Sequence, residues 1–260
     1  MKDEREAETI VELIRRHDHC FLEGAYTHFA TADEEESPLF DIQQKRFQDW
    51  LSWLSARGMR PPVVHVSNSA AAIRIPDQSY QYIRLGISMY GLKPSIDFTL
   101  PFPIREAFSL HSRLIHVKRL EPGETISYGA TYTAQNDEWI GTIPIGYADG
   151  WIRKLAKTAE VLIEGERAKI VGRICMDMCM VRLPRPMPVG AKVTLIGKQG
   201  NDRISIDDIA VQLDTINYEI PCMITSRVPR IYLKNGRRIG TSNPVLKHSS
   251  YIFKNGRRTL

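Results

Sequence analysis

The sequence has 260 residues, of which 43% are hydrophobic and 25% are charged. This balance excludes a largely disordered chain and provides enough apolar side chain for one large core or two modest ones. The formal net charge is +5, but nine of the 35 Lys/Arg lie in residues 227–260, which contain no Asp/Glu. The first 226 residues therefore carry 26 basic and 30 acidic side chains and are mildly acidic.

The chain shows no targeting signal and no metal-binding motif. Residues 1–17 lack the apolar block of a signal peptide, and no apolar run is long enough to span a bilayer, so we expect a cytoplasmic protein without a membrane partner. The four cysteines (Cys20, Cys175, Cys179 and Cys222) form no Cys-x-x-Cys motif and accompany no pair of histidines. We therefore expect reduced cysteines in the core and no metal site.

Helical and strand-like segments alternate up to residue 90. In chain order, the pattern predicts a helix over 2–17, a strand over 20–29, a helix over 39–57, a strand over 63–66, a helix over 70–74 and a strand over 82–90. Such alternation is typical of βα units on a parallel sheet, and about three units are present.

Short strands separated by turns follow Pro101 and Pro103. We predict them over 110–120, 139–145, 159–163, 168–174, 179–183 and 192–196, with one helix over 205–213. Glycine-containing turn signals lie at 121–124, 164–166 and 188–190. This half of the chain is predicted to be an all-β domain.

The C-terminal region contains a small basic repeat. Lys-Asn-Gly-Arg-Arg stands at 234–238 and again at 254–258, and Asn-Gly favours a hairpin turn. The repeat is either an arm that binds nucleic acid or a solvated terminus. We favour the solvated terminus, because no aromatic stacking platform or nucleic-acid motif accompanies the charge.

Three tyrosines, Tyr128, Tyr132 and Tyr147, lie among glycines and small residues in the segment 124–151. Small residues let a backbone approach a ligand closely, and a tyrosine can serve as an acid or base when its neighbours lower its pKa. The alternative is a hairpin whose tyrosines pack on a sheet. The spacing alone favours the hairpin.

Polar residues follow the predicted strands of the first half. Residues 27–33 end the first strand, 65–69 end the second, and 84–87 lie in the third. A TIM barrel collects its catalytic groups at these strand ends and often holds a phosphate at a helix N-terminus near its last strands.

With four further motifs, these segments closely resemble alanine racemase, in the family's order, from about residue 1 to 233. The motifs are Ser127-Tyr128-Gly129-Ala130-Thr131-Tyr132, Gly146-Tyr147-Ala148-Asp149-Gly150, Arg173-Ile174-Cys175-Met176-Asp177 and Ile216-Asn217-Tyr218-Glu219. The resemblance implies an α/β plus all-β fold. Residues 1–102 correspond to the last three βα units of a TIM-type barrel that binds pyridoxal 5′-phosphate, 103–240 to the family's β domain, and 241–260 to a basic tail.

By the same resemblance, the first five barrel units have no counterpart in this sequence. Two residues of the family's site therefore have no counterpart either: the lysine that binds the cofactor covalently, and an arginine that supports the cofactor and the substrate carboxylate. We therefore expect the chain to be inactive alone. Whether Met1 is a genuine start, a truncation or an internal methionine is open at this point.

The implied activity is the interconversion of L- and D-alanine, which supplies D-alanine for peptidoglycan. The family works as a homodimer, in which Tyr128 would act on the partner's cofactor and the missing lysine would serve the opposite face of the substrate. His28 corresponds to the histidine that contacts this tyrosine. Arg84 corresponds to the arginine that faces the pyridine nitrogen, and His65 to the histidine that orients it. Because an arginine does not give up its proton, the ring nitrogen would stay unprotonated.

The remaining correspondences concern the cofactor phosphate and the substrate. Phosphate contacts are implied for Ser69, Gly86, Ile87 and Tyr218, and substrate contacts for the backbone amide of Met176 and for Tyr147. An access corridor that favours small amino acids is implied for Asp33, Tyr147, Arg153, Arg173 and Ile216. Taken singly, each of these residues has an ordinary structural explanation, such as a core histidine or a surface ion pair. Their common order in these motifs favours the functional explanation for the catalytic, cofactor and substrate residues, and leaves both explanations open for the corridor residues, since a charged rim needs no function.

Three alternatives stay open. The chain could belong to a racemase for another small amino acid, such as serine. It could be a non-catalytic fragment that dimerises through its β domain, with apolar faces of its incomplete barrel exposed. It could bind nucleic acid through its basic tail, which the missing stacking platform and nucleic-acid motif disfavour.

Overall fold

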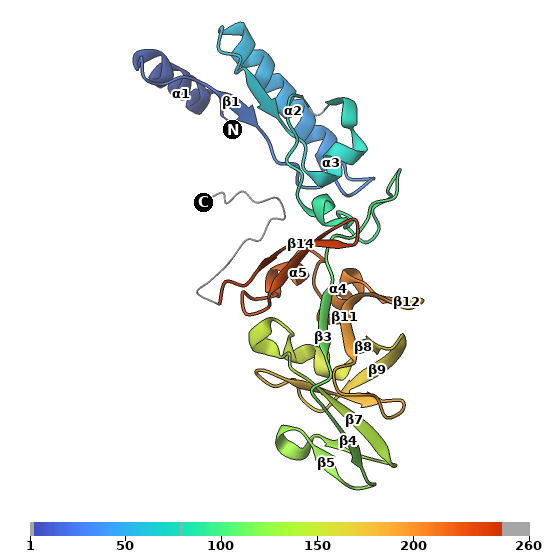
Figure 1. The fold of residues 1–260 in the computed structure, drawn as a ribbon. Coiled ribbons are helices and arrows are strands. Elements are labelled where there is room, and N and C mark those ends of the chain that lie inside the picture. The colour runs from blue at the N-terminus through green and yellow to red at the C-terminus, as the bar shows by residue number, and fades with distance from the viewer. Residues whose placement is uncertain (1–2, 79, 246–260) are drawn as a thin grey trace. The chain divides into compact units, whose positions relative to one another are not determined.

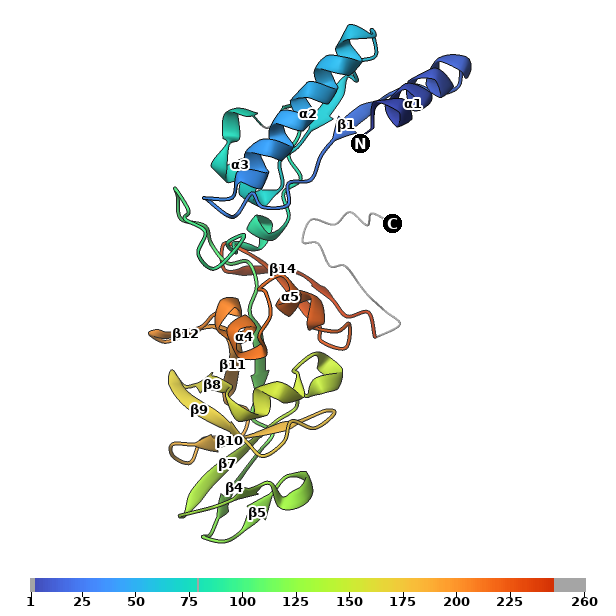
Figure 2. The same ribbon diagram turned by 180° about the vertical axis from the view of Figure 1, so that it is seen from behind.

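The computed structural model describes residues 3–78 and 80–245. The chain divides into two compact units, Met1–Ala107 and Phe108–Leu260 (Figures 1 and 2). The domain limits expected at residues 102 and 240 stay a prediction. In the described part of the chain, no helix has the length and apolarity needed to cross a membrane.

The first unit alternates helices with short strands. Its elements are α1 (Glu4–Arg16), β1 (Gly24–Tyr26), α2 (Pro38–Ala56), β2 (Val63–His65), α3 (Ser69–Arg74) and the 3-10 turns η1 (Pro76–Gln78) and η2 (Ile87–Tyr90). The expected helices are confirmed by α1, α2 and α3. Helix α1 begins at Asp3, whose side chain accepts a hydrogen bond from the Arg5 amide, and the helix ends with two arginines that suit its dipole.

Strands β1 and β2 are parallel neighbours. Tyr26 pairs with His65 in their register, and α2 is the crossover between the two strands, beside which it lies in Figure 1. Phe29 and Val66, just after the two strands, pack with Phe40 of α2 and with Phe98 in one buried cluster. This packing brings the polar residues that follow β1 and β2 to the same edge of the sheet.

Two strand predictions in this unit need correction. The strand expected over 20–29 is limited to Gly24–Tyr26, the part of it that β2 can pair. The strand expected over 82–90 is not formed, and Ile87–Tyr90 is a single 3-10 turn. The backbone of Gly86, with ψ of −99°, leaves the extended region, and the Arg84 amide makes one bond of the strand type, to the Ser67 carbonyl. The apolar composition of this segment did not show that it would form no ladder with a neighbouring strand.

The second unit is built on an antiparallel eight-stranded sheet. Its order is β12-β11-β8-β9-β10-β7-β4, and β3 also pairs with β11. These strands are β3 (Leu110–Arg113), β4 (His116–Leu120), β7 (Glu138–Ile143), β8 (Glu160–Ile163), β9 (Glu166–Val171), β10 (Cys179–Leu183), β11 (Lys192–Gln199) and β12 (Asp202–Ile204). Two small hairpins accompany the sheet, β5 (Thr125–Ile126) with β6 (Tyr132–Thr133), and β13 (Arg230–Lys234) with β14 (Arg237–Ser242).

Helical segments complete the second unit. They are α4 (Ile206–Leu213), α5 (Glu219–Met223) and the 3-10 turns η3 (Tyr128–Ala130), η4 (Tyr147–Asp149) and η5 (Arg153–Lys157). Ser205 caps α4 by accepting from the Asp208 amide, and Asp208 accepts in return from the Ser205 amide. The helix expected over 205–213 is therefore confirmed, and the reciprocal capping by Ser205 and Asp208 explains where it begins.

The core of the second unit lies at the centre of its sheet. Val161, Leu162, Ile163 and Leu195 have no exposed surface, and β11 is buried continuously from Val193 to Gly197. Each such aliphatic side chain stabilises the fold by about 1.5–3 kcal/mol when it leaves water. Both faces of these central strands are therefore covered, which explains why their sequences are continuously apolar.

The predicted β-rich half is confirmed, with one strand divided. The run 110–120 forms two strands, because the Leu114 amide bonds the Ala191 carbonyl while the Ile115 amide bonds the Thr142 carbonyl. The chain thus changes its neighbour from β11 to β7 at this point. Asn235-Gly236 forms the expected turn between β13 and β14, whereas the second basic repeat, 254–258, lies outside the described residues.

The expectation of core cysteines holds only in part. Cys179 is buried and Cys175 is half-buried, but Cys20 and Cys222 are exposed, so the core placement is wrong for these two. All four are free thiols. Cys20 precedes the short β1, and Cys222 lies near the end of α5.

Candidate active site

The guanidinium of Arg84 is held at the carboxyl ends of β1 and β2. Its Nη2 donates to the Thr27 carbonyl at 2.8 Å and to the Val66 carbonyl at 3.1 Å, and it lies 3.4 Å from His28 Nδ1. Its Nη1 is hydrogen-bonded to His65 Nδ1. None of these partners is a carboxylate, so the arginine is fixed in place while its positive charge is not neutralised by them.

His65 is itself held by stacking. Its ring lies on Tyr26 with centroids 5.3 Å apart and an interplanar angle of 10°, and Tyr26 also faces the Arg84 guanidinium at 5.4 Å. Burial, and next the charge of Arg84, lower the pKa of His65 below its ordinary value. A neutral imidazole can accept a hydrogen bond from Arg84, which a protonated one cannot.

A second cluster of polar side chains and backbone amides surrounds Ser69 at the start of α3. Asn68 caps this helix by accepting from the Ala71 amide. The buried Ser69 Oγ accepts from the Gly86 amide at 2.9 Å and from the Ser88 amide at 3.4 Å. Ser88 Oγ is buried and has no hydrogen-bond partner among the described residues. Hydroxyls and amides gathered in this way match the donors that hold a phosphate group.

In the second unit, seven residues line a cavity of about 330 Å³. They are Tyr128, Tyr147, Arg153, Arg173, Ile174, Cys175 and Met176. Tyr128 therefore comes together with four of the residues expected to contact substrate or form the corridor, although they lie up to 48 residues apart in the sequence.

Tyr128 stands on a turn with unusual backbone geometry. Ser127, Gly129 and Ala130 have φ values of 72°, 74° and 48°, and the Tyr128 side chain is 73% exposed. Positive φ is costly for serine and alanine and persists where the surroundings enforce it. Here the Arg173 amide donates to Ser127 Oγ at 2.8 Å. Gly172 allows this approach, because a Cβ at that position would lie 2.5 Å from the Ser127 Cβ.

Tyr147 lies on a second turn, η4, that packs against the Cys175–Met176 backbone. The Tyr147 amide donates to the Cys175 carbonyl at 3.0 Å, and the Gly146 amide donates to the Asp149 carboxylate at 2.9 Å. Gly146 has no room for a side chain, because a Cβ would lie 2.2 Å from the Cys175 carbonyl oxygen. The turn η4 and the Cys175–Met176 loop therefore hold each other in place, and each forms one wall of the cavity.

Tyr132 has a different environment from the other two tyrosines. It is half-buried, and its hydroxyl donates to the carboxylate of the buried Glu138. Burial, and next the bond to Glu138, raise the pKa of Tyr132. These contacts give Tyr132 a structural role on the hairpin, as the packing interpretation of the tyrosines predicted for all three.

Several expected site residues are not brought into the Tyr128 cavity. His28, Asp33, His65, Ser69, Arg84, Gly86 and Ile87 belong to the first unit. In the second unit, Ile216 and Tyr218 lie between α4 and α5, are exposed, and do not line that cavity. The side chain of Asn217 between them donates to Asp207 at 2.8 Å, which holds this loop against α4.

Sequence reasoning did not identify several supporting residues. Tyr26, the Thr27 carbonyl and Ser127 position the groups described above, and Cys175 lines the Tyr128 cavity. Tyr26 could have been found from the parallel register, which places it opposite His65. Ser127 has no such signal, because its contact with Arg173 spans 46 residues.

Comparison with known proteins assigns both units. The model of the alanine racemase N-terminal domain matches residues 1–94, and that of the alanine racemase C-terminal domain matches residues 107–232. The chain is 60% identical over 247 residues to the alanine racemase of Geobacillus stearothermophilus, which covers 94% of this chain. The chain belongs to the alanine racemase family.

Solved structures of alanine racemases agree with this assignment. The alanine racemase of Bacillus anthracis with bound L-Ala-P gives a TM-score of 0.90 at 44% identity, over 94% of this chain and 64% of that one. Histidine racemase from Leuconostoc mesenteroides gives a TM-score of 0.79 at 28% identity, over 90% of this chain and 62% of that one. The expected fold class, part of an α/β barrel followed by a β domain, is confirmed.

The match to the alanine racemase family covers most of this chain but less of its relatives. The chain spans 63% of the length of the Geobacillus protein. Alanine racemases are pyridoxal 5′-phosphate-dependent enzymes, so membership of the family implies this cofactor class.

Proposed function

We propose that this chain provides the tyrosine, arginine and phosphate-binding parts of a pyridoxal 5′-phosphate-dependent alanine racemase. The observation that carries the proposal is the fixation of Arg84 by neutral acceptors, the Thr27 and Val66 carbonyls and the His65 ring. A rigid cation that no carboxylate neutralises there is suited to face the nitrogen of an aromatic ring as a hydrogen-bond donor.

The residues around Ser69 fit the phosphate of this cofactor. In the proposal, the Ser69 hydroxyl and the amides of Gly86 and Ile87 hold the phosphate, together with the Tyr218 hydroxyl. The buried cluster of Ser69 Oγ with the Gly86 and Ser88 amides supports this role, because it supplies uncharged donors at a helix start. When bound, the cofactor withdraws electrons from the substrate Cα and makes its proton easier to remove.

Tyr128 is proposed to move the proton on one face of the substrate Cα through its hydroxyl oxygen. Its turn is fixed by the Ser127–Arg173 bond while its ring remains largely exposed, which leaves the hydroxyl free to meet a ligand. By resemblance to the family, Tyr128 acts at the cofactor of a second copy in a homodimer, where His28 contacts it. The second acid or base would be the lysine that the resemblance did not locate in this sequence.

Alanine is the proposed substrate. The cavity of about 330 Å³ lies at the small end of the range of ligand sites, and its arginines, Arg153 and Arg173, can attract a carboxylate. The Met176 amide is proposed to contact the substrate carboxylate, and Tyr147, Asp33 and Ile216 to narrow the access corridor. A structural neighbour named histidine racemase keeps other amino acids, serine included, as alternatives.

The test joins this chain to the part of the Geobacillus alanine racemase that it does not match and measures interconversion of L- and D-alanine with added cofactor. We expect no racemisation by the 260-residue chain alone and racemisation by the joined protein. Tyr128→Phe in the joined protein should lose activity in at least one direction, because it removes the hydroxyl that carries the proton.

Tyr232→Phe is the matched control, because it removes an exposed tyrosine hydroxyl from β13 and should leave the rate unchanged. Normal racemisation by Tyr128→Phe in both directions would refute the role of this residue. A joined protein that binds the cofactor and racemises serine faster than alanine would replace the proposed substrate.

A further inference from the structure

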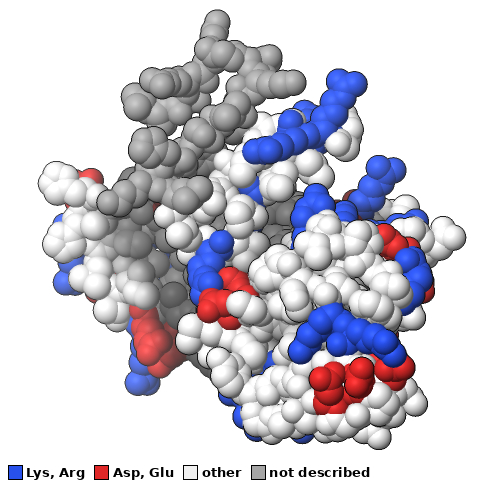
Figure 3. Space-filling view, turned by 60° about the horizontal axis from the view of Figure 1, so that its bottom comes forward, with Lys and Arg blue, Asp and Glu red and all other residues white. Residues whose placement is uncertain are grey.

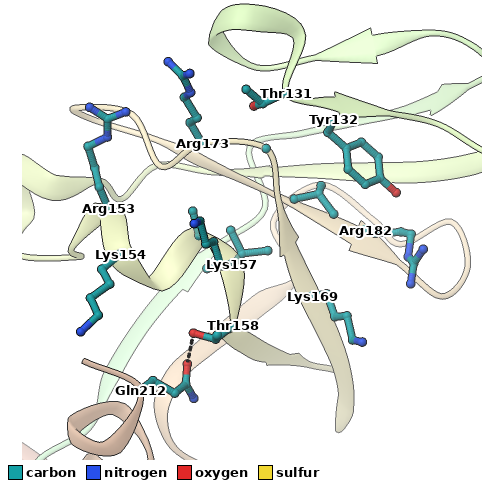
Figure 4. Close-up of a pocket in the computed structure, with 14 residues that line it drawn as sticks. Thr131, Tyr132, Arg153, Lys154, Lys157, Thr158, Lys169, Arg173, Arg182 and Gln212 are labelled. Carbon is teal, nitrogen blue, oxygen red and sulfur yellow. Dashed lines mark hydrogen bonds between the residues drawn. The ribbon is translucent and has the colours of Figure 1, made fainter. Parts of the chain in front are cut away.

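A basic groove lies next to the Tyr128 cavity in the second unit. Its volume is about 880 Å³, and among the described residues no Asp or Glu lines it (Figure 4). Six of its lining residues are cationic: Arg153, Lys154, Lys157, Lys169, Arg173 and Arg182. We refer to this feature, lined by these six residues, as the basic groove.

Several arginines elsewhere in the second unit are paired with carboxylates. Arg167 contacts Asp202 at 2.6 Å and Glu160 at 3.2 Å, and Arg185 contacts both Glu164 and Glu166 within 3.0 Å. Figure 3 shows the same mixture, with basic and acidic side chains next to one another on the face that it draws. The charges of these two arginines are therefore balanced locally.

Most cations of the basic groove have no such carboxylate partner among the described residues. In the part of the chain that the structure describes, four of them have no carboxylate within 4.0 Å: Arg153, Lys157, Lys169 and Arg173. The other two are engaged, since Lys154 donates to the Leu213 carbonyl at 2.7 Å and Arg182 lies 3.8 Å from Glu138. Like charges gathered in this way repel one another, and an anion among them would offset the repulsion.

The walls that carry these cations are well anchored. Segment η5 is held by Leu155, which is 1% exposed, and the Thr158 hydroxyl beside it bonds Gln212 of α4 at 3.0 Å. Lys169 stands on β9, between neighbours β8 and β10, and Arg173 follows the end of the same strand. Figure 4 shows Arg153 and Arg173 extending in the same direction from η5 and from the β9 side. The cations thus come from rigid elements rather than from a loose loop.

We propose that the basic groove binds a small organic anion with at least two negative charges, such as a polycarboxylate or a phosphorylated compound. The groove volume lies within the range of small-molecule sites. A ligand with separated charges can reach cations of both walls at once, Lys157 on η5 and Lys169 on β9, and the second contact then forms at a high effective concentration. The Thr131 hydroxyl, which also lines the groove, supplies an uncharged donor beside them.

The basic groove and the Tyr128 cavity share Arg153 and Arg173. An anion in the groove therefore competes for two arginines that also line the cavity. This assignment does not depend on racemase activity, because binding to the groove involves residues and a volume that the Tyr128 cavity does not contain.

The test is calorimetric titration of the 260-residue chain with citrate and with inorganic pyrophosphate, and with acetate as a monovalent reference. We expect saturable binding of citrate or pyrophosphate that weakens as salt is added, with acetate binding much more weakly. The two arms distinguish a preference for carboxylate from one for phosphate. Lys157→Gln and Lys169→Gln should each raise Kd by about tenfold, the change expected when one charge-assisted hydrogen bond is lost.

Lys198→Gln is the matched control, because it removes one exposed lysine from β11, outside the groove, and changes the net charge equally. Far-UV circular dichroism of each variant establishes that it is folded. An equal loss of affinity in Lys198→Gln, or unchanged affinity in both groove variants, would overturn the proposal. So would self-association that the groove variants abolish while neither probe binds, since the groove would then hold a second copy of the chain.

Discussion

Ser127 and Arg173 hold each other across the base of the turn that carries Tyr128. The Arg173 amide donates to Ser127 Oγ at 2.8 Å, and the same hydroxyl donates to the Arg173 carbonyl at 3.4 Å. The Arg173 guanidinium also lies beside Gly129, 3.6 Å from the position that a Cβ would occupy. Arg173 therefore contacts the residues on both sides of Tyr128, and it also lines the cavity.

Two substitutions of Ser127 separate its hydrogen bonds from its backbone strain. Ser127→Ala removes both bonds and keeps the φ of 72°, so we expect the free energy of unfolding to fall by about 0.5–1.5 kcal/mol. Ser127→Gly removes the same bonds but relieves strain of about 1–3 kcal/mol, which exceeds the entropic penalty of glycine. Urea unfolding should therefore rank Ser127→Gly above Ser127→Ala. The reverse order would show that Ser127 is not strained.

The contact between Arg84 and His65 predicts a change in titration. Burial is the main cause that lowers the pKa of His65, and the charge of Arg84 adds to it. Arg84→Gln removes the charge, so the pKa of His65 should rise toward 6.5 without reaching it. The imidazole Cε1–H resonance followed by NMR over pH measures this shift.

Arg74→Gln is the matched control for that titration. It removes an arginine of the same unit whose side chain bonds the Glu34 and Glu35 carbonyls instead of His65. The His65 titration should be the same in this variant as in the unmodified chain. Identical His65 titrations in Arg84→Gln and Arg74→Gln would contradict the electrostatic contact.

His111 predicts how stability depends on pH. Burial, and next the charge of Lys192, lower the pKa of His111 from 6.5 to about 4, and its Nδ1 lies 3.1 Å from Thr194 Oγ1. Between these two pH values the unfolded chain binds a proton that the folded chain does not bind. Stability should therefore fall as the pH is lowered from 6.5 to about 4.

Urea unfolding midpoints across this pH window measure the effect. His111→Gln should flatten the dependence, because glutamine does not titrate, whereas His116→Gln on the exposed surface of β4 should retain it. We expect only a small part of the effect of a fully buried histidine, since His111 is an exposed residue of β3 and only its hydrogen bond to Thr194 is part-buried. A steeper acid loss in His111→Gln would exclude this histidine as the cause.

The four thiols should differ in reactivity. Burial raises the pKa of Cys179 to about 12, while Cys20 and Cys222 are exposed. Because the thiolate is the reactive form, a disulfide reagent should modify Cys20 and Cys222 quickly and Cys179 only after unfolding in urea. Cys222→Ser should remove one fast-reacting thiol, and Cys179→Ala should leave the number of fast-reacting thiols unchanged. Fast modification of Cys179 in the folded chain would show that β10 opens locally.

Local patterns in the sequence were sufficient for elements whose causes are local. The helix expected over 39–57 is α2, the helix over 205–213 is α4 with its Ser205 cap, and Asn235-Gly236 forms a hairpin turn. Each follows from neighbouring residues through periodicity, capping or turn chemistry. The order of the motifs also indicated the family, which the comparisons then established.

Elements whose identity depends on a distant partner were predicted less well. The apolar run 82–90 is no strand, because its backbone bonds to distant described residues are isolated ones, from Arg84 to Ser67 and from Ala107 to Tyr90, and do not form a ladder. The run 110–120 divides in two, because Leu114 and Ile115 bond different strands. Apolar composition does not identify the neighbour that pairs with a segment, and in the run 82–90 it did not indicate burial either, since Tyr82 and Met89 are exposed.

The sequence by itself determined the family, most of the helices and strands, and the identity of the candidate site residues, since each rests on patterns within short segments. Only the tertiary structure decided that Tyr128 stands on a strained turn held by Arg173, and that Arg153 and Arg173 belong to both the Tyr128 cavity and the basic groove. Those relationships arise because the antiparallel sheet brings together residues that are far apart in the sequence. Hydrogen bonding and charge repulsion between such residues depend on their distance in space, which the sequence does not show.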